Sequence, residues 1–260
     1  MINDVKHPLV TIITVCYNAA LELEKTINSV ISQSFMNREY IIIDGGSTDS
    51  THMVIDKYNS NIDRWISEPD KGIYDAMNKG ITLANGEWVI FLNAGDLFAS
   101  ERVLSNVFKE KKYPNDIGLI FGDCILSFGN NKNILKSFCN RDIYKDHSSF
   151  CHQALFTRCS LARKILFDTS YRIIADYIMV DTILNSNIKA SYQNLPIAVY
   201  DMSGISSTHE LLMFKEKVRY LRSPKDITYY IKYSKMLLKK LIVDILGEKI
   251  LLKIIYYKVK

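Results

Sequence analysis

The amino-acid sequence predicts an α/β fold with a mostly parallel central sheet, and three observations predict it. Four apolar runs, at residues 9–16, 40–43, 64–66 and 88–92, alternate with helical patterns over the first hundred residues. The first run, LVTIITVC, is continuous and rich in β-branched residues, which is typical of a strand buried on both faces. Strand, helix, strand, helix is the order of βαβ units, whose right-handed crossovers make the strands parallel.

Three segments between these runs are predicted helices. Residues 20–35, ALELEKTINSVISQSF, carry apolar side chains at helical spacing, namely Leu23, Ile27, Val30 and Ile31. Residues 50–58 form the second predicted helix, and residues 73–84 form the third. Each segment lies where a parallel sheet needs a crossover connection.

Composition places the chain among ordinary globular proteins. Of its 260 residues, 48% are hydrophobic and 23% are charged. The five cysteines are odd in number and form no CxxC pair, which argues against a disulfide framework or a structural zinc site and favours a reducing compartment. The first eight residues lack the apolar region of a signal peptide, and no run is long enough for a transmembrane helix. We therefore expect a cytoplasmic protein.

The positive charge is concentrated at the C-terminal end. Residues 211–260 hold eleven Lys and two Arg against two Asp and two Glu, a net charge of +9, which leaves −4 for residues 1–210. From Asp226 onward, apolar residues recur at helical spacing and several lysines occupy another face. Such a helical tail can lie on an anionic membrane surface, or it can pack on the domain with its lysines in solvent. No nucleic-acid recognition motif is present, so nucleic acid is not an expected partner.

Polar residues follow each predicted strand. The first run ends at Tyr17-Asn18, the second at Asp44, the third at Glu68-Pro69-Asp70, and the fourth at Asn93 through Asp96. In open α/β sheets, ligands bind in the crevice beyond the carboxyl ends of the strands, so these groups are expected to converge on a site. One such ending alone would indicate only a turn or a helix cap.

The pattern of these residues indicates the kind of ligand. A dinucleotide fold would place GxGxxG after the first strand, whereas that turn here reads CYNAALE, and the phosphate-loop pattern GxxxxGK[ST] is also absent. A carboxylate-lined site repels a diphosphate unless a divalent cation bridges them. Mg²⁺ or Mn²⁺ is the cation that such oxygen ligands favour.

Four segments in order, TIITVCYNA, YIIIDGGSTDST, ISEPDKGIYDAMNKGI and GEWVIFLNAGD, resemble the family 2 glycosyltransferases. The likeness is greatest to the bacterial branch that builds O-antigen, capsule and exopolysaccharide. It is dense over residues 9–100 and thinner to about residue 210. The resemblance implies a GT-A type α/β/α sandwich, with a nucleotide-sugar-binding half at 1–105 and an acceptor-binding half at 106–210. The basic tail, 211–260, follows.

The resemblance implies a donor site made by the first half. Asp44 aligns with the aspartate that contacts the nucleotide base, although an Asx turn before Gly45 is the alternative. Ser47, Thr48 and Asp49 are expected to cap the next helix. The remaining nucleotide or donor contacts that the resemblance implies are Thr14, Tyr17, Asn18, Asp70, Lys71, Asn78, Asn93 and Ala94.

Asp96 is the metal ligand that the resemblance implies, since it matches the last aspartate of the family's DxD-type motif. The expected ion is Mn²⁺ or Mg²⁺. Asn93 and Gly95 stand where many members carry aspartates, so this chain departs from the pattern there. The LNAGD form is familiar within the polysaccharide branch and is interpreted as a variant. A catalytically inactive nucleotide-sugar-binding subunit is the alternative function.

The second half resembles the branch's acceptor side in FCHQALFTR, YRIIADYIMV and MSGIS. Asp176 matches the catalytic base of an inverting transfer, which needs one carboxylate near the acceptor hydroxyl. Asp176 as a helix-start residue, and Asp181 as a rival base, are the alternatives. His152 and Gln153 are expected to line the acceptor pocket or contact the diphosphate, and Ser203 replaces the first glycine of the branch's GGxS.

The function implied is transfer of a hexose from a nucleotide-diphosphate donor, a UDP-sugar by preference, to a saccharide hydroxyl. The acceptor implied is polyprenyl-diphosphate-linked, in surface polysaccharide biosynthesis. The enzyme would then be peripheral at the inner face of the bacterial cytoplasmic membrane. A nucleotidyltransferase shares the sheet topology but opens with a glycine-rich loop, which this chain lacks.

Overall fold

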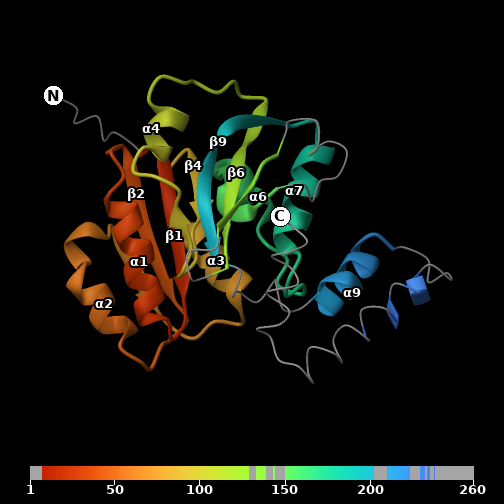
Figure 1. The fold of residues 1–260 in the computed structure, drawn as a ribbon, viewed down its shortest axis with the longest axis horizontal. Helices are drawn as coiled ribbons and strands as arrows, with labels where there is room; N and C mark the ends of the chain where they lie inside the picture. Colours follow the sequence, from red (N-terminus) through yellow and green to blue (C-terminus); the bar gives the residue numbers. More distant parts are fainter. Residues whose placement is uncertain are drawn as a thin grey trace.

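The computed structural model describes residues 8–128, 133–138, 143, 150–201, 210–222, 229–231, 233–234 and 237. Within these residues the chain forms a nine-stranded sheet with helices on both faces (Figure 1). The strand order is β3-β2-β1-β4-β8-β6-β9-β5, and β7 pairs with β6 off this path. The α/β fold with a mostly parallel sheet is confirmed.

The first half of the sheet is parallel because each strand is followed by a helical crossover. Its strands are β1 (Val10–Cys16), β2 (Arg38–Asp44), β3 (Arg64–Ser67) and β4 (Trp88–Phe91). The helices between them are α1 (Ala20–Ile31), α2 (Thr51–Lys57), the short η1 (Asn59–Asn61) and α3 (Ile73–Leu83). All four predicted strands and all three predicted helices are present. The first helix ends at Ile31, four residues before the predicted end.

The strand order reverses between β1 and β4. The chain moves outward from β1 to β3 through α1 and α2, then crosses back to β4 through α3. Since such crossovers are right-handed, the reversal puts α3 on the opposite face from α1 and α2. Figure 1 shows α1 and α2 together beside the sheet. A reversal of this kind opens a crevice at the carboxyl ends of β1 and β4.

The second half of the sheet mixes directions. Its strands are β8 (Leu155–Arg158), β6 (Ile117–Ser127), β9 (Lys189–Asp201), β5 (Leu97–Phe98) and β7 (Asn133–Lys136). β8 is antiparallel to both β4 and β6, so β6 and its parallel neighbour β9 run in the same direction as the first four strands. The helical elements here are α4 (Val103–Phe108), η2 (His152–Ala154), α6 (Cys159–Ile165), α7 (Ala175–Asn185) and α9 (Glu210–Tyr220).

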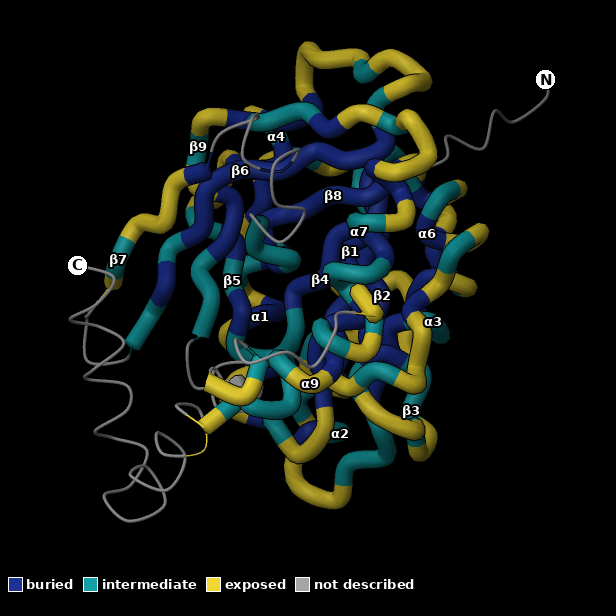
Figure 2. Tube along the Cα trace, turned by 90° about the vertical axis from the view of Figure 1, so that its right-hand side faces the viewer, coloured by how far each residue is buried: buried dark blue, intermediate teal, exposed yellow. Residues whose placement is uncertain are grey.

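One hydrophobic core joins the two halves. Every residue of β1 is buried, and the inner strands form the dark centre of the molecule in Figure 2. The core cluster contains Ile12 and Ile41 from the parallel half together with Ile120 and Phe156 from the mixed half. The predicted division of residues 1–210 into two functional halves therefore falls within a single sheet and a single core.

The predicted tail from residue 211 lies largely outside the described residues. Its first described element, α9, contacts the region around α7 through side chains considered below. Residues 229–231 and 233–234 are helical, in agreement with the helix predicted from Asp226. Within the described part of the chain, no helix has the length and apolar character needed to cross a membrane.

Candidate active site

The ends of β1, β2 and β3 meet at one edge of the sheet. A Cβ atom added to Gly45, just after β2, would lie 2.5 Å from Oδ2 of Asp70 and 3.5 Å from Cδ2 of Tyr17. The absence of a side chain at Gly45 therefore lets the Asp70 carboxylate approach the β2 turn. Tyr17 is 63% exposed, so its ring is available to a ligand. Two of the predicted donor contacts, Tyr17 and Asp70, thus lie against the turn that follows Asp44, as the parallel topology requires.

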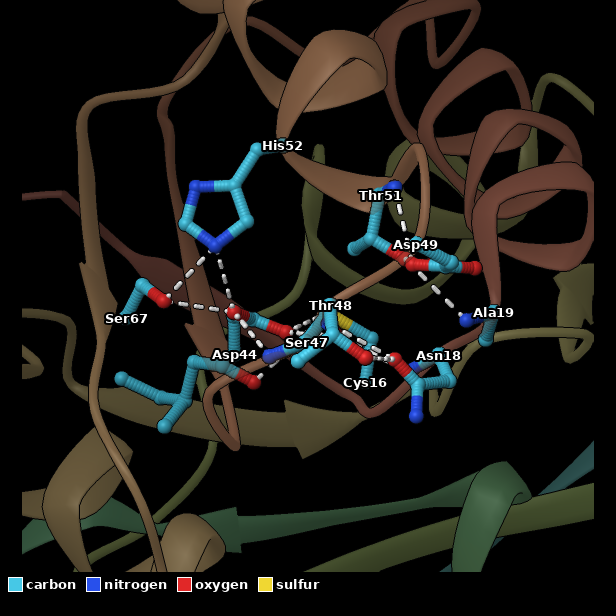
Figure 3. Close-up of polar contacts among 11 residues, drawn as sticks. Cys16, Asn18, Ala19, Asp44, Ser47, Thr48, Asp49, Thr51, His52 and Ser67 are labelled. Carbon is cyan, nitrogen blue, oxygen red and sulfur yellow. Dashed lines mark hydrogen bonds and ion pairs between the residues drawn. The ribbon is translucent and has the colours of Figure 1, made fainter.

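Asp44 is fully buried at the centre of a polar network (Figure 3). Its Oδ2 accepts hydrogen bonds from Ser67 Oγ at 2.6 Å and from the Ser47 backbone N–H at 3.0 Å, and the Ser47 hydroxyl donates to Oδ1. His52 Nε2 lies 3.2 Å from Oδ2. Although burial raises the pKa of Asp44, these hydrogen bonds and His52 outweigh it and lower the pKa below its usual range. The carboxylate is therefore ionised, and the neighbouring residues hold it rigidly.

Ser67, His52 and Asp44 are residue types that also form hydrolytic triads, but their geometry excludes that role. Nε2 of His52 makes both contacts, at 3.0 Å to Ser67 Oγ and 3.2 Å to Asp44. A triad histidine uses one ring nitrogen for the nucleophile and the other for the carboxylate. His52 and Ser67 instead hold the Asp44 carboxylate in place.

Asn18 connects the β1 and β2 turns. It has a positive φ of 48°, its backbone N–H donates to Ser47 Oγ at 2.7 Å, and its side-chain Oδ1 accepts from the Thr48 N–H at 2.8 Å. Of the three residues expected to cap the next helix, Asp49 accepts from the N–H of Thr51, the first residue of α2, at 3.0 Å, while the N-cap position itself is Ser50 and has no side-chain cap hydrogen bond. Ser47 and Thr48 serve the turn network instead. The side-chain oxygen of Asn18 is therefore committed to the turn, and its predicted donor contact stays a prediction.

β8 brings His152 to the same edge of the sheet. Because β8 runs antiparallel to β4, the residues before β8 lie at the carboxyl end of β4. These residues form η2, and Nε2 of His152 lies 3.5 Å from the Asn93 side-chain nitrogen just after β4. On its other side, Nδ1 of His152 lies 3.3 Å from Oδ2 of Asp176. His152 therefore connects the predicted donor side with the predicted base.

Asp176 is the second residue of α7 and is held from several sides. Its Oδ1 accepts from the Tyr177 backbone N–H at 2.8 Å and lies 3.2 Å from Tyr74 Oη of α3, whose hydroxyl donates to the Ile173 carbonyl at 2.8 Å. Burial raises the pKa of Asp176, but the hydrogen bond and positive charge of His152 outweigh it and lower the pKa. Burial lowers the pKa of His152, but the hydrogen bond and charge of Asp176 outweigh that effect and raise it to about 9. The two side chains therefore form an ion pair at neutral pH.

Asp96 is a buried carboxyl close enough to this pair for the charge of His152 to lower its pKa. Only 4% of the residue is exposed, and burial, the larger effect, raises the pKa of its carboxyl to about 7. Its Oδ1 accepts from the backbone N–H of Asp201 at 3.3 Å, because the end of β9 reaches this edge of the sheet. Gln153 of η2 also hydrogen-bonds to Asp96. Cys151 Sγ lies 3.0 Å from both Gln153 Oε1 and Cys124 Sγ, and both thiols are free.

The donor chemistry around Asp96 fits a divalent cation. Asn93 Oδ1 is a buried oxygen with no hydrogen-bond partner among the described residues, and the Asp96 carboxyl is buried three residues later. Because protonated His152 presents an N–H to the Asn93 side chain, a rotation of the amide gives this oxygen to His152 instead of to a cation. The described residues hold no cluster of three His, Cys, Asp or Glu side chains suited to a metal. Mg²⁺ and Mn²⁺ do not require one, since phosphate and water oxygens complete their coordination.

Two of the predicted donor contacts are engaged elsewhere in the structure. Thr14 is fully buried inside β1, and its hydroxyl lies 3.1 Å from Tyr40 Oη, so Thr14 belongs to the core. Asn78 on α3 uses its amide twice on the backbone of Phe167, donating to the carbonyl at 2.9 Å and accepting from the N–H at 2.8 Å. Both groups of Asn78 are committed to a structural contact between α3 and the segment after α6.

The other predicted residues divide into three groups. Lys71 is exposed beside Asp70, and Ala94 follows Asn93 at the β4 end, so both lie at the expected edge and their roles stay predictions. The rival base Asp181 accepts from Tyr220 Oη at 2.6 Å and so faces α9. Ser203 and the three residues after it lie outside the described residues.

Three residues of the site were missed by sequence reasoning. His52, Ser67 and Tyr74 contact Asp44 or Asp176, and the sequence patterns assigned no role to any of them. Tyr74 lies within the quoted segment ISEPDKGIYDAMNKGI, but its partner is 102 residues further along the chain. Only the three-dimensional structure brings the two together.

Comparisons with known proteins identify the family. The model of Glycosyl transferase family 2 matches residues 11–166. A PGL/p-HBAD biosynthesis glycosyltransferase of Mycobacterium tuberculosis is 32% identical over 209 residues, which cover 77% of this chain and 80% of the relative. The Escherichia coli UDP-Glc:alpha-D-GlcNAc-diphosphoundecaprenol beta-1,3-glucosyltransferase WfaP is 27% identical over 230 residues, covering 84% of this chain and 86% of that protein.

Solved structures show the same fold. The mannosyltransferase PcManGT of Pyrobaculum calidifontis, in complex with GDP-Man and Mn²⁺, superposes with a TM-score of 0.62 at 20% identity. That alignment covers 82% of this chain and 65% of the mannosyltransferase, so this chain spans just under two thirds of its length. S. aureus TarS 1–349 with UDP-GlcNAc also gives 0.62, at 17% identity, over 90% of this chain and 71% of TarS. The family match spans more than half of the chain, and the chain therefore belongs to glycosyl transferase family 2 and is a glycosyltransferase with the GT-A fold.

Proposed function

We propose that this glycosyltransferase moves a hexose from a nucleoside-diphosphate sugar to a hydroxyl of a lipid-linked saccharide, with inversion at the anomeric carbon. The observation that carries the proposal is the row of side chains Asp176, His152 and Asn93, which begins at an ionised carboxylate and ends at the residue whose carbonyl accepts from the Asp96 N–H. The printed name of the Escherichia coli relative supports a UDP-sugar donor and a diphosphoundecaprenol-linked acceptor. The name of the Escherichia coli relative gives UDP-Glc and TarS is solved with UDP-GlcNAc, whereas the mannosyltransferase is solved with GDP-Man. Uracil is therefore the base that we propose by preference.

Asp176 is the proposed general base. Its lowered pKa keeps it ionised at neutral pH, and about a quarter of its side chain is exposed to an incoming acceptor. The carboxylate accepts the proton of the acceptor hydroxyl as that oxygen attacks the anomeric carbon. Tyr74, Tyr177 and His152 hold the Asp176 carboxylate in one orientation. Little conformational freedom of this side chain therefore has to be lost when the reaction takes place.

The buried polar cluster around Asp96 is the proposed diphosphate side of the site. Asp96 and the Asn93 amide oxygen are the groups that would hold Mn²⁺ or Mg²⁺. The bound cation would supply positive charge that stabilises the departing diphosphate. The pKa of His152 is about 9, so at neutral pH its ring adds a positive charge between the buried cluster around Asp96 and the proposed base, Asp176. A developing negative charge in a buried site gains most from such preorganised groups.

The β1, β2 and β3 ends form the proposed nucleotide side. Asp44 is fully buried, so its proposed contribution is to hold the turn that faces the nucleotide base, and Tyr17 and Asp70 lie against the same turn at Gly45. The basic segment from residue 211 is proposed to hold the enzyme at an anionic membrane surface, where a lipid-linked acceptor is found. The proposed place of work is the inner face of a cytoplasmic membrane.

The deciding experiment is the Asp176→Asn variant, which keeps the shape of the side chain and removes its basicity. Turnover should fall by about 10² to 10⁴, the range of general-base assistance, while the affinity for the nucleoside diphosphate stays that of the wild type. Full turnover in the variant would remove Asp176 from the mechanism. NMR analysis of the product gives an independent check, because an anomeric configuration identical to that of the donor contradicts direct displacement.

Three further measurements test the remaining assignments. Transfer should stop with a chelator and return with Mn²⁺ or Mg²⁺, and Asp96→Ala should abolish that response. Calorimetric titration of Asp44→Ala with the nucleoside diphosphate should show weaker binding, whereas an unchanged Kd would limit Asp44 to the turn. Sedimentation with anionic vesicles at low salt should capture the full chain, and neutral vesicles serve as the control.

A further inference from the structure

Glu216 is a buried acidic side chain on α9, the helix that opens the basic C-terminal segment. Only 6% of the residue is exposed. Its carboxylate accepts hydrogen bonds from three consecutive backbone N–H groups, those of Arg172 at 2.8 Å, Ile173 at 3.0 Å and Ile174 at 3.3 Å. Glu216 therefore holds the turn at residues 172–174, and both lie beyond the residues that match the family model.

That turn leads directly into the proposed base. Ile174 is the residue before α7, and Asp176 is the second residue of that helix. The carbonyl of Ile173 accepts from Tyr74 Oη at 2.8 Å, and the same hydroxyl lies 3.2 Å from Oδ1 of Asp176. Glu216 and Tyr74 thus hold Ile173 from opposite ends, one through its N–H and the other through its C=O.

The rest of α9 supports this contact from the same helix face. Arg219 donates to the carbonyl of Ser170 at 2.8 Å, and its guanidinium lies 3.8 Å from the centre of the Tyr171 ring. Tyr220 donates to Asp181 at 2.6 Å. Positions three and four apart on a helix lie side by side, so Glu216 and these two residues form a single docking face. Of the three, Glu216 contacts the residues that immediately precede Asp176.

We propose that Glu216 is a positioning residue, which orients the Asp176 carboxylate by holding the turn at residues 172–174. The proposal rests on the proposed role of Asp176 as the general base. A carboxylate suits this place because it only accepts hydrogen bonds and because negative charge is favourable at the start of a helix. A glutamine would turn an NH₂ group toward a backbone N–H, so the turn would shift. A shift of about 1 Å in a reacting group can cost up to 10² in rate.

The test is a double-mutant cycle in the full-length chain. Glu216→Gln should lower kcat roughly ten- to a hundredfold, leaving the donor KM and the affinity for the nucleoside diphosphate at wild-type values. Adding Glu216→Gln to Asp176→Asn should cause no further loss, because the group that Glu216 positions has gone. Tyr220→Phe is the matched control, since it removes another α9 hydrogen bond and leaves the 172–174 turn in place. Its kcat should match the wild type.

The outcomes separate the two proposals. A normal kcat in Glu216→Gln, with Asp176→Asn impaired, overturns the positioning role and leaves the base assignment intact. Additive losses in the double variant show that Glu216 acts independently of Asp176 and also overturn it. Full turnover in Asp176→Asn overturns the base assignment, and the positioning role with it. If Glu216→Gln does not fold, Glu216→Asp, which keeps the charge and shortens the reach, enters the same cycle.

Discussion

The ion pair between His152 and Asp176 should make the stability of this protein depend on pH in a defined window. The pKa of His152 is raised from 6.5 to about 9, so protonated His152 stabilises the folded state. That contribution is fully present below pH 6.5 and is lost as the pH rises through about 9. Asp176 has a lowered pKa, so its own contribution is lost only under acidic conditions, well below this window.

The size of the effect follows from the shift and from the exposure of the pair. One pKa unit corresponds to about 1.4 kcal/mol, which sets an upper value of about 3 kcal/mol for a rise from 6.5 to about 9. The side chains of His152 and Asp176 are 24% and 23% exposed, so solvent screens part of the attraction. We expect about 1 to 3 kcal/mol, or roughly 2 to 10 °C in Tm for a chain of this size.

The assay is thermal unfolding of the wild type and of His152→Gln from pH 6 to pH 9.5. The wild type should lose more Tm across the window than the variant, which has no titrating group at this position. Asp96, whose pKa is raised to about 7, titrates in the same window, and the charge of His152 lowers that pKa. Because His152→Gln would therefore shift the titration of Asp96, the comparison is made with Asp96→Asn present in every protein. Asp176→Asn should flatten the curve in the same way as His152→Gln. Parallel curves for all three proteins would refute the ion pair.

Three further predictions concern single contacts. Glu39 is buried in β2 and accepts three hydrogen bonds of 2.6 to 2.7 Å, one from Thr11 and two from Asn85. Glu39→Ala should therefore lower the free energy of unfolding, measured by denaturation, by about 3 to 5 kcal/mol, and a loss no larger than that of replacing an exposed glutamate contradicts this. Asn78→Ala removes two hydrogen bonds to Phe167, so it should lower the free energy of unfolding by about 2 to 3 kcal/mol and leave the affinity for the nucleotide unchanged. Unchanged stability with weaker nucleotide binding, measured by calorimetry, would make Asn78 a donor contact. Gly45→Ala should displace the Asp70 carboxylate at a cost of about 1 to 3 kcal/mol and weaken nucleotide-sugar binding; a lower Tm with unchanged Kd would make Asp70 structural.

The parallel half of the fold was predictable because its signals are local. A continuous β-branched run, an amphipathic helix and a polar strand end can each be identified within about ten residues. Parallel topology then places Tyr17, Asp44 and Asp70 at one edge without further information. The same logic could not separate Thr14 from these residues, because proximity to a strand end does not reveal which side chains remain inside the core.

The mixed half depends on contacts that no local pattern contains. His152 reaches Asn93 only because β8 runs antiparallel to β4, and the sequence of β8 alone does not state its direction. Asn78 and its partner Phe167 are 89 residues apart, so no local pattern shows that the amide of this asparagine is hydrogen-bonded to the backbone of Phe167. Glu216 lies in a segment whose charge pattern indicates a solvated or membrane-facing helix, and its burial against the 172–174 turn comes from tertiary packing.

The insertion of β8 beside β4 has a consequence for synthesis of the chain on the ribosome. β4 is complete at residue 91, but the strand that covers its open edge begins at residue 155. At about 5 to 20 residues per second, that edge waits roughly 3 to 13 seconds for its partner. During this interval the nascent parallel half presents the unpaired N–H and C=O groups of an apolar strand, which is the kind of edge that other chains can join. A pause in translation between residues 91 and 155 would lengthen the interval, so slow codons in this stretch should reduce the yield of soluble protein.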